Sequence, residues 1–386
     1  MPAPDGLPFT YHRRDLARTY VDGLLGGGLM DFRSGLFLTA PRRTGKSTFL
    51  REDLIPELHD RDMLPVYVDL WADRAADPAQ VIAEAIRTAL RETEGTRGRL
   101  FRLTRVKKVS VPGGFSIDLD TIGQPSGTTL TDALSELARR ADKIVCLIVD
   151  EAQHAVTTSR GIDAMHALKA ARDFLTMGEA GRRLTLVFTG SHRDKLGSLV
   201  RNRNEPFFGA QILEFPLLGR GYTDAFTAWV NERLAADNAF KPEDVWTAFQ
   251  TLGRRPEQLA ALLTSVAFSA NKGAGSVALS ARAQIQRESQ WHEFDAQFDA
   301  LTAIQQAVLR QILIHGDGFS PFAADMYPVY SALAGHKVTK GGVQAALDAL
   351  REKNVLWRSA TGVYALEDQA MLEWHAQRFP TDRGVS

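Results

Sequence analysis

One stretch of the chain combines a glycine, a lysine and a small hydroxyl at a spacing that can hold phosphate groups. It ends in Gly45-Lys46-Ser47, follows the apolar run 36–38 and leads into the apolar pair Phe49-Leu50. This order favours a loop between a strand and a helix. In such a loop, backbone N–H groups wrap a triphosphate, the lysine ammonium meets the outer phosphates and the serine oxygen ligates Mg2+. The sequence therefore predicts a phosphate-binding loop for ATP or GTP. The alternative is a basic turn before an ordinary helix.

The expected nucleotide-binding residues are the loop and the residue after it: Ala40, Pro41, Arg42, Arg43, Thr44, Gly45, Lys46, Ser47 and Thr48. The usual pattern of such loops starts with glycine, and Ala40 stands at that position. Alanine at a positive φ would carry strain that glycine avoids. The backbone at this position is therefore an open question for the structure.

A second motif places two carboxylates at the end of an apolar run. Residues 144–149 are all apolar, and Asp150 and Glu151 follow them. A central parallel strand whose C-terminal end opens on a nucleotide site has this pattern. Asp150 would join Ser47 in holding Mg2+, and Glu151 would polarise the attacking water. The alternative is a solvated strand end.

Further candidates for chemistry follow another predicted strand, at 184–188. Ser191, with Thr189 beside it, could lie between the catalytic carboxylate and the γ-phosphate, although strand capping is the alternative. Arg201 and Arg203 could neutralise charge on the transferred phosphoryl group, in cis or from a neighbouring subunit. Loop arginines are more often solvated or salt-bridged.

The composition is that of an ordinary globular chain. Lysines plus arginines and aspartates plus glutamates number 46 each, so no global charge draws the chain to nucleic acid or to a membrane. At 386 residues the chain is long enough for about two or three domains. The single cysteine, Cys146, lies in the apolar run before Asp150 and is expected in the core. No signal-peptide pattern and no membrane-spanning stretch are evident, so a cytoplasmic location is expected.

The elements that must position these residues suggest an α/β fold in three parts. Residues 1–220 would form a nucleotide-binding core with alternating strands and helices, and residues 221–301 a helical lid. Residues 302–386 give three helices and two short strands, the pattern of a winged helix-turn-helix.

Residues 95–129 interrupt the core pattern. Two alternating segments flank Pro112-Gly113-Gly114 and predict a β-hairpin. Ahead of and within this hairpin stand six basic residues with no acidic residue among them: Arg97, Arg99, Arg102, Arg105, Lys107 and Lys108. This cluster could neutralise nucleic-acid phosphates, so DNA is a candidate partner.

The motifs in their order resemble the archaeal-type ATPases of the STAND group, within the AAA+-like P-loop NTPases. The resemblance is carried by the segments 40–47, 148–153, 188–191, 206–209 and 253–256 and by the C-terminal helices and strands. It implies a parallel sheet of strand order 5-1-4-3-2, a helical lid, a winged helix and ATP as the nucleotide. Two features depart from the family pattern: Ala40 replaces a glycine, and Arg254-Arg255 occupy a turn that is rich in glycine in many relatives.

Three functional readings follow. The first is a Mg2+-dependent ATPase that acts as a conformational switch. The second is a DNA-binding protein controlled by ATP. The third is a scaffold in which ATP sets the oligomeric state. Residues 290–386 carry eight lysines and arginines against eleven aspartates and glutamates. A dedicated DNA reader is usually basic, so a protein partner is as plausible for this segment as DNA.

Overall fold

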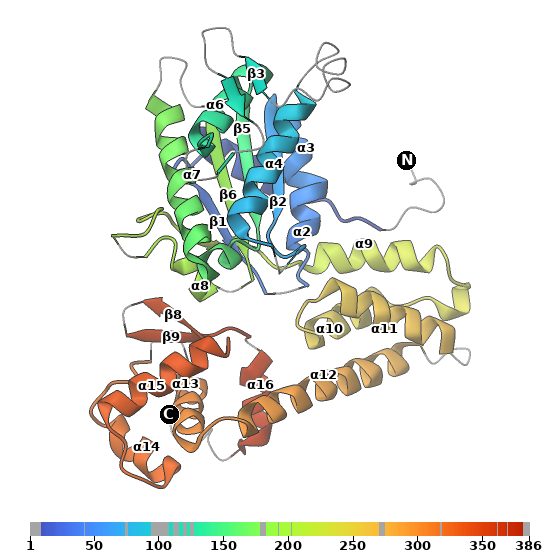
Figure 1. Cartoon of the computed structure of the whole chain (residues 1–386). Coiled ribbons are helices and arrows are strands. Elements are labelled where there is room, and N and C mark those ends of the chain that lie inside the picture. The colour runs from blue at the N-terminus through green and yellow to red at the C-terminus, as the bar shows by residue number, and fades with distance from the viewer. Residues whose placement is uncertain are drawn as a thin grey trace. The chain divides into compact units, whose positions relative to one another are not determined.

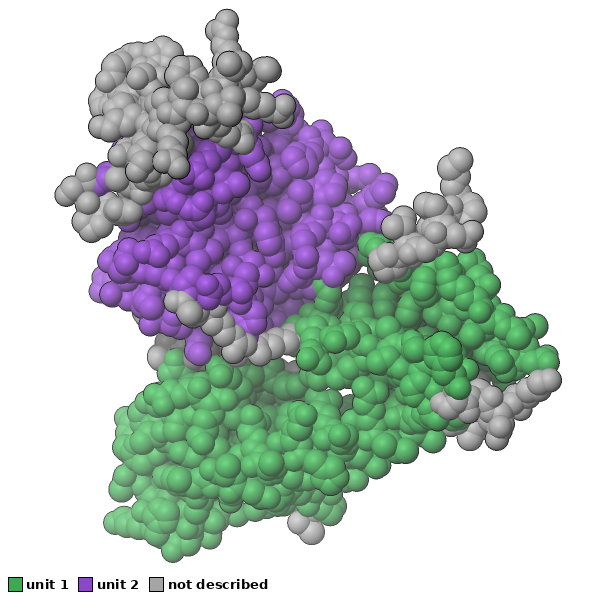
Figure 2. Space-filling view, turned by 45° about the vertical axis from the view of Figure 1, so that its right-hand side comes forward, with its two compact units in different colours: residues 1–11, 41–45, 216–386 green, residues 12–40, 46–215 purple. Residues whose placement is uncertain are grey.

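The computed structural model describes residues 9–41, 43–73, 76–93, 108–110, 116–118, 122–123, 127–177, 183–191, 193–201, 203–269, 275–316, 319–360, 362–368 and 370–380. The chain divides into two compact units, coloured separately in Figure 2. Residues 12–40 and 46–215 form one, here called the sheet unit. Residues 1–11, 41–45 and 216–386 form the other, here called the C-terminal unit.

A five-stranded parallel sheet forms the centre of the sheet unit (Figure 1). Its strands are β1 (Leu36–Thr39), β2 (Met63–Asp69), β5 (Ile144–Asp150), β6 (Leu184–Gly190) and β7 (Ile212–Glu214). They lie in the order β2-β5-β6-β1-β7. If these five strands are numbered 1 to 5 in chain order, the sheet has the order 2-3-4-1-5. Read from the other edge of the sheet, this is the predicted order 5-1-4-3-2. The predicted fold class is therefore confirmed.

Apolar residues on both faces explain why these strands are central. On one face Phe37, Leu147 and Phe188 belong to a single buried cluster. On the other face Leu38 and Cys146 belong to a second buried cluster. Strands buried on both sides are typical of a parallel sheet covered by helices, and they have near-continuous apolar sequences. Cys146 is fully buried, as predicted, and burial raises the pKa of its thiol to about 12.

Helices pack on both faces of this sheet. Their bounds are α1 (Arg14–Leu25), α2 (Lys46–Phe49), α3 (Ile55–Asp60), α4 (Pro78–Glu92), α6 (Leu130–Ala141), α7 (Ser159–Met177) and α8 (Arg193–Gly197), with a 3-10 segment η3 (Ala152–Thr157). Residues of α4, α6 and α7 join the cluster of Phe37, whereas residues of α1 and α3 join the cluster of Leu38. The glycine run over 26–28 predicts the end of a helix, and Gly26 ends α1 in a left-handed conformation.

The residues after the phosphate-loop sequence predict a single helix over 48–58, but the structure has a more complex helical segment there. It starts at Lys46, two residues earlier than predicted. A π-helical segment, η1 (Leu50–Leu54), separates α2 from α3. Single π-helical turns are frequent at functional sites. The early start places Lys46 and Ser47 in the first turn of the helix.

The predicted hairpin between α4 and α6 contains a short antiparallel pair. Strands β3 (Lys108–Ser110) and β4 (Ser116–Asp118) align Val109 with Ile117. The turn residues 112–114 and the basic residues 97, 99, 102, 105 and 107 lie outside the described residues, as does the side chain of Lys108. The antiparallel pairing is confirmed. The proposed nucleic-acid contact stays a prediction.

Helices dominate the first half of the C-terminal unit, as predicted. They are α9 (Arg220–Asn231), η4 (Ala236–Asn238), α10 (Pro242–Thr251), α11 (Pro256–Ser269) and α12 (Gly275–Asp299). Their buried side chains form one cluster that includes Phe226, Phe249 and Leu263. Phe9 packs its ring on Phe226 at 5.0 Å between centroids, so the described N-terminal residues join this cluster.

The end of the chain forms a second cluster in the same unit. Its elements are α13 (Ala303–His315), α14 (Met326–Ala334), α15 (Lys340–Glu352), the antiparallel strands β8 (Leu356–Ala360) and β9 (Val363–Leu366), and α16 (Ala370–Arg378). The 25-residue helix α12 contributes to both clusters of this unit. Leu279 lies in the first cluster, whereas Phe294 and Phe298 lie in the second.

Candidate functional site

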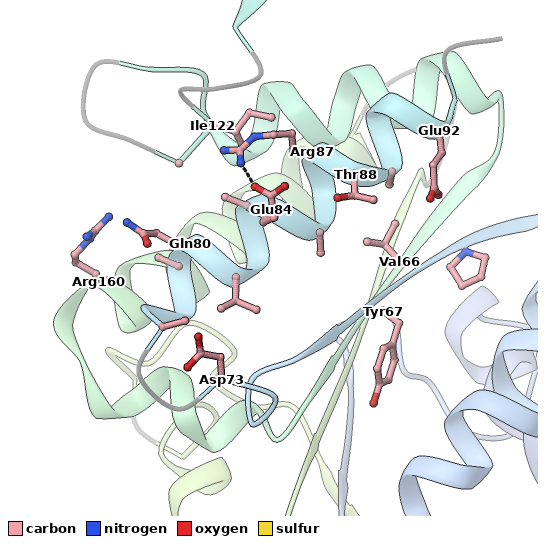
Figure 3. Close-up of a pocket in the computed structure, with 18 residues that line it drawn as sticks. Val66, Tyr67, Asp73, Gln80, Glu84, Arg87, Thr88, Glu92, Ile122 and Arg160 are labelled. Atoms are coloured by element: carbon pink, nitrogen blue, oxygen red, sulfur yellow. Dashed lines mark hydrogen bonds and ion pairs between the residues drawn. The ribbon is translucent and has the colours of Figure 1, made fainter. Parts of the chain in front are cut away.

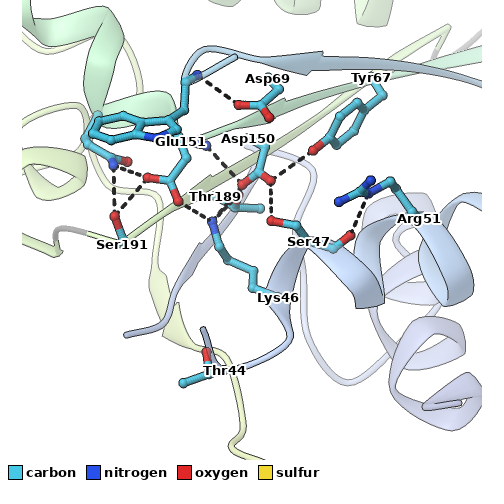
Figure 4. Close-up of polar contacts among 12 residues, drawn as sticks. Thr44, Lys46, Ser47, Arg51, Tyr67, Asp69, Asp150, Glu151, Thr189 and Ser191 are labelled. Carbon is cyan, nitrogen blue, oxygen red and sulfur yellow. Dashed lines mark hydrogen bonds and ion pairs between the residues drawn. The ribbon is translucent and has the colours of Figure 1, made fainter. Parts of the chain in front are cut away.

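The C-terminal ends of β5 and β6 and the first turn of α2 bring polar side chains together in the sheet unit (Figure 4). Strands β5 and β6 are parallel neighbours, so Asp150 and Thr189, near their ends, lie at one edge of the sheet. Lys46 and Ser47 extend from α2 toward this edge. The side chains of the two motifs thus lie together, and their functional roles stay predictions.

Lys46 is the centre of this cluster. Its side chain is only 6% exposed, yet it carries a charge. Its Nζ donates to Asp150 Oδ1 at 2.6 Å, to Thr189 Oγ1 at 2.9 Å and to Glu151 Oε1 at 3.2 Å. These three acceptors match the three protons of an ammonium group. A buried ammonium is stable only when it is paired and hydrogen-bonded, and here it is both.

Asp150 has partners on both carboxylate oxygens. Oδ2 accepts hydrogen bonds from Ser47 Oγ at 2.8 Å and from the Tyr67 hydroxyl at 3.0 Å, while Oδ1 faces Lys46 and Thr189. Burial alone would raise the pKa of this carboxyl. The Lys46 ammonium and the hydrogen bonds outweigh burial and lower the pKa to about 2. Asp150 is therefore a carboxylate at neutral pH.

Glu151 has an unusual backbone and a well-fixed side chain. Its φ is +55°, in the left-handed region that residues other than glycine rarely adopt. Its Oε2 accepts from Ser191 Oγ at 2.8 Å and from Gln153 Nε2. Burial opposes ionisation, but Lys46 and these two donors lower the pKa of Glu151 below its ordinary value. Strained backbone of this kind concentrates at functional sites.

Ala40, at the position usually held by glycine, has an unstrained backbone. Ala40 is buried and its φ is not positive, so no strain results from the missing glycine. The left-handed positions in the loop are instead Gly45, with φ +91°, and Arg43, with φ +65°. Thr44 is buried and donates its hydroxyl to Pro41 O at 2.8 Å, which ties the loop to itself.

The other predicted site residues lie apart from the Lys46 cluster or outside the described residues. Arg43 is exposed and its Nε is 3.4 Å from Glu257 Oε2. Thr48 is also exposed. Arg201 lies against Gly197 on α8, and Arg203 is exposed; the described hydrogen bonds of the cluster include neither arginine. Arg42 lies outside the described residues.

Sequence reasoning missed two members of the cluster, Tyr67 and Gln153. Tyr67 lies within β2, next to β5. Residues 64–70 predict a short buried strand, and that pattern gives no reason to single out one of its side chains. Gln153 is 1% exposed and donates to both Glu151 and Ser191. It stands two residues after Glu151, and this spacing within the motif was the available signal.

The cluster offers oxygen ligands suited to a magnesium ion. Ser47 Oγ and Asp150 Oδ2 are 2.8 Å apart, and both are hard oxygen donors. Among the described residues, no group of three or more histidine, cysteine, aspartate or glutamate side chains could hold a metal alone. Mg2+ typically binds through one or two protein oxygens together with substrate phosphates and waters. The residues present fit this mode.

A separate pocket of about 750 Å3 lies beside α4 and β2 (Figure 3). Its lining mixes charged, polar and apolar side chains, and Glu84 and Arg87 form an ion pair within it. Val66 points toward α4, whereas the Tyr67 ring points away from it, because successive side chains of a strand alternate. The same alternation sends the Tyr67 hydroxyl to Asp150.

Comparison with known families gives a match over part of the chain. The sequence model of the family described as "AAA domain" matches residues 32–195. This range contains Lys46, Ser47, Asp150, Glu151 and Ser191. Over this range the chain is similar to AAA domains, and the matched range contains every residue of the Lys46 cluster.

Solved structures share the fold of this chain over most of its length. The Walker-type ATPase PABY2304 of Pyrococcus abyssi has a TM-score of 0.57 at 16% identity, over 95% of this chain and 96% of that chain. The ORC2 protein of Aeropyrum pernix in its ADP form has a TM-score of 0.57 at 15% identity, over 99% and 97% of the two chains. Such identities show the fold alone, which is that of P-loop NTPases. Comparison with curated proteins gives no match.

None of the helices in the described ranges combines the length and the apolar character needed to cross a membrane.

Proposed function

We propose that this chain binds ATP together with Mg2+ and hydrolyses the γ-phosphate bond. One observation carries the proposal: α2 and the end of β5 bring Lys46, Ser47, Asp150 and Glu151 into a single hydrogen-bonded cluster, within the range that is similar to AAA domains. An ammonium, a hydroxyl and two carboxylates are the groups that phosphoryl transfer needs for positioning and charge neutralisation. A structural ion pair would need only one carboxylate.

Each residue has a distinct task in this proposal. The Lys46 ammonium, now shared among Asp150, Thr189 and Glu151, turns to the terminal phosphates when a nucleotide binds. Ser47 and Asp150 would hold Mg2+, which would supply neutralisation of charge on the phosphate oxygens. Glu151, kept ionised by its neighbours, orients a water molecule and accepts its proton. Ser191 contacts both Glu151 and the incoming γ-phosphate.

The loop ahead of α2 supplies the phosphate cradle. Gly45 and Arg43 adopt left-handed conformations, and alternation of backbone conformation turns successive N–H groups toward one side. The N-terminus of a helix adds a favourable dipole for phosphate. We expect the N–H groups over 41–48 to hold the triphosphate.

Nucleotide binding and turnover test the proposal. Titrating a fluorescent ATP analogue with Mg2+ should show binding in the wild type and in Glu151→Gln, and a large loss in Lys46→Ala. Glu151→Gln should lower kcat by about 100-fold or more, the usual size of a general-base effect. Lys169→Ala is the matched control, because Lys169 is a half-exposed lysine on α7 paired with Asp173. A wild type that neither binds nor hydrolyses nucleotide with Mg2+ would disprove the proposal.

We further propose that the nucleotide controls a conformational or assembly switch of the STAND type. In this proposal residues 1–220 are the ATPase core, 221–301 a lid and 302–386 a winged helix-turn-helix. The elements α13, α14, α15, β8 and β9 occur in the order of a winged helix, which supports the last assignment. Mass measured by light scattering, with and without Mg2+-ATP, tests the assembly. If the mass is the same with and without Mg2+-ATP, the nucleotide does not control assembly, and only the conformational switch is left.

A role in DNA binding is the alternative function, supported by the six basic residues over 97–108. Binding through phosphate contacts weakens steeply with salt. Titrating labelled duplex DNA at rising salt should therefore give a binding constant whose logarithm falls linearly with the logarithm of the salt concentration. Replacing Arg97, Arg99 and Arg102 by alanine should make this line less steep. A flat or absent binding curve would remove DNA from the account.

A further inference from the structure

A glutamine amide links the two polar strand ends of the candidate site. Gln153 Nε2 donates to Ser191 Oγ at 3.1 Å and to Glu151 Oε2. Ser191 Oγ itself donates to the same Glu151 oxygen at 2.8 Å. Glu151 directly after β5, Gln153 on η3 and Ser191 directly after β6 thus close a small hydrogen-bonded ring. Both amide protons are used on the two groups that would contact the water and the γ-phosphate.

The orientation of this amide is fixed by Gly190. With both protons directed at Glu151 and Ser191, Gln153 Oε1 points onto the backbone of β6. A Cβ at Gly190 would lie only 2.5 Å from Oε1 and 3.5 Å from Gln153 Cδ. Gly190 has no positive φ, so the backbone conformation does not require glycine. Glycine is required at this position because a side chain would occupy the space of the Gln153 amide.

The arrangement also has a cost that a purely structural residue would avoid. Gln153 is 1% exposed, and its Oε1 has no hydrogen-bond partner among the residues that the structure describes. Buried amide oxygens are normally satisfied, and an exception needs an explanation. An apolar residue would fill the same space without leaving an acceptor unpaired. The unpaired oxygen is therefore explained if the two N–H donors of the same amide are needed to hold Glu151 and Ser191.

We propose that Gln153 is a positioning residue for the reaction. It holds the Glu151 carboxylate and the Ser191 hydroxyl in one geometry, and Gly190 keeps its amide in the orientation that allows this. The inference rests on the ATPase activity proposed above and names a residue that sets its rate. Gln153 acts through Glu151 and Ser191, so it affects the chemical step rather than nucleotide binding.

Two substitutions test the proposal from opposite sides. Gln153→Ala removes the donors, whereas Gly190→Ala leaves Gln153 in place and displaces the end of its flexible side chain. Both should lower kcat about tenfold or more while KM changes less than about threefold, because an interaction used only in the transition state affects kcat. The double variant should be no slower than Gln153→Ala, since the added methyl acts only through the amide.

Matched controls separate this effect from general destabilisation. Gly341→Ala adds a methyl where nothing lies within 4 Å. Gln344→Ala removes an exposed glutamine that donates to Asp348 at 3.0 Å. Both should keep the wild-type kcat. A folded Gly190→Ala variant with the wild-type kcat, or fully additive losses in the double variant, would overturn the inference and leave the ATPase activity standing.

A second readout does not depend on turnover. In nucleotide-free protein, the side-chain amide protons of Gln153 are donated to Glu151 and Ser191, so they should exchange slowly with solvent. Gly190→Ala should make them exchange faster, whereas Gly341→Ala should not. Amide protons that exchange equally slowly in Gly190→Ala and in the wild type would overturn the inference, whether or not the wild type hydrolyses ATP.

Discussion

Two carboxylates and one ammonium meet in the sheet unit, so the cluster carries a net negative charge before any nucleotide arrives. A triphosphate would add further negative charge, which the Lys46 ammonium alone does not balance. Divalent magnesium beside Ser47 and Asp150 would offset part of this negative charge. The proposed Mg2+ would therefore have an electrostatic role in binding as well as in chemistry.

The charge of Asp150 leads to a prediction about acid stability. Its pKa falls from the ordinary 3.8 to about 2 in the folded chain, so the carboxylate stabilises the fold above pH 3.8 and loses this contribution as the pH falls toward 2. We expect the free energy of unfolding to decrease between pH 4 and pH 2, and to decrease less in Asp150→Asn. Urea denaturation at each pH measures it. Asp60→Asn, at an exposed position on α3, is the control; equal pH dependence in all three proteins would contradict the prediction.

At the residue scale, the sequence allowed prediction of the groups that belong to recognisable spacings. Lys46, Ser47, Asp150 and Glu151 stand in such motifs, and they converge as expected. Tyr67 does not, because it reaches Asp150 only through the alignment of β2 with β5, in which Asp69 pairs with Asp150. Register between distant strands is set by the whole sheet, and a local spacing does not contain it.

Helix α12 owes its length to contacts with other elements and not to its own sequence pattern alone. Helical structure over 222–301 was predictable, but the apolar spacing did not indicate one unbroken helix over 275–299. The reason is that its apolar residues face two partners in turn: Leu279 packs in one cluster, and Phe294 and Phe298 pack in another. Helix α16 was missed for a related reason, since its burial depends on α12.

The contact between α16 and α12 leads to a second prediction. Trp374 is 2% exposed, packs on Phe298 at 5.5 Å between ring centroids, and donates its indole N–H to Asp295 Oδ1 at 2.9 Å. Trp374→Ala should reduce the free energy of unfolding by about 3–5 kcal/mol, the usual cost of removing a large buried aromatic. Trp374→Phe keeps a ring and should cost less. Guanidinium denaturation compares the two, and an unchanged midpoint in Trp374→Ala would refute this packing.

At the scale of the whole molecule, the strand order followed from the family resemblance, whereas the division into units did not follow from the linear domain boundaries. The C-terminal unit includes residues 1–11 and 41–45 as well as 216–386. Segments far apart in sequence therefore belong to one compact body. Within it, Arg255 before α11 pairs with Asp368 before α16 at 2.7 Å, which ties the two clusters together in addition to α12.

This shared architecture predicts that the C-terminal unit does not tolerate truncation at residue 301. Ending the chain there would expose Trp291, Phe294 and Phe298, which are at most 9% exposed in the full chain. Contiguous exposed apolar surface promotes association and removes the tertiary support of the helix. We expect the truncated chain to lose more helix by circular dichroism than the deleted helices contribute, and to aggregate. A truncated chain that is monomeric and keeps α12 helical would show that the cluster of Phe226, Phe249 and Leu263 is enough to stabilise this helix, and would contradict the prediction.

The single thiol of this chain sits at the centre of the sheet, fully shielded from solvent. Maleimide dyes react with exposed thiolates, and burial keeps Cys146 both inaccessible and protonated. The natural sequence can therefore serve directly as a background for labelling. A cysteine placed on an exposed position of α7 and a second one on α15 would accept a donor and an acceptor dye, and single-molecule energy transfer would then follow the distance between them as nucleotide is added.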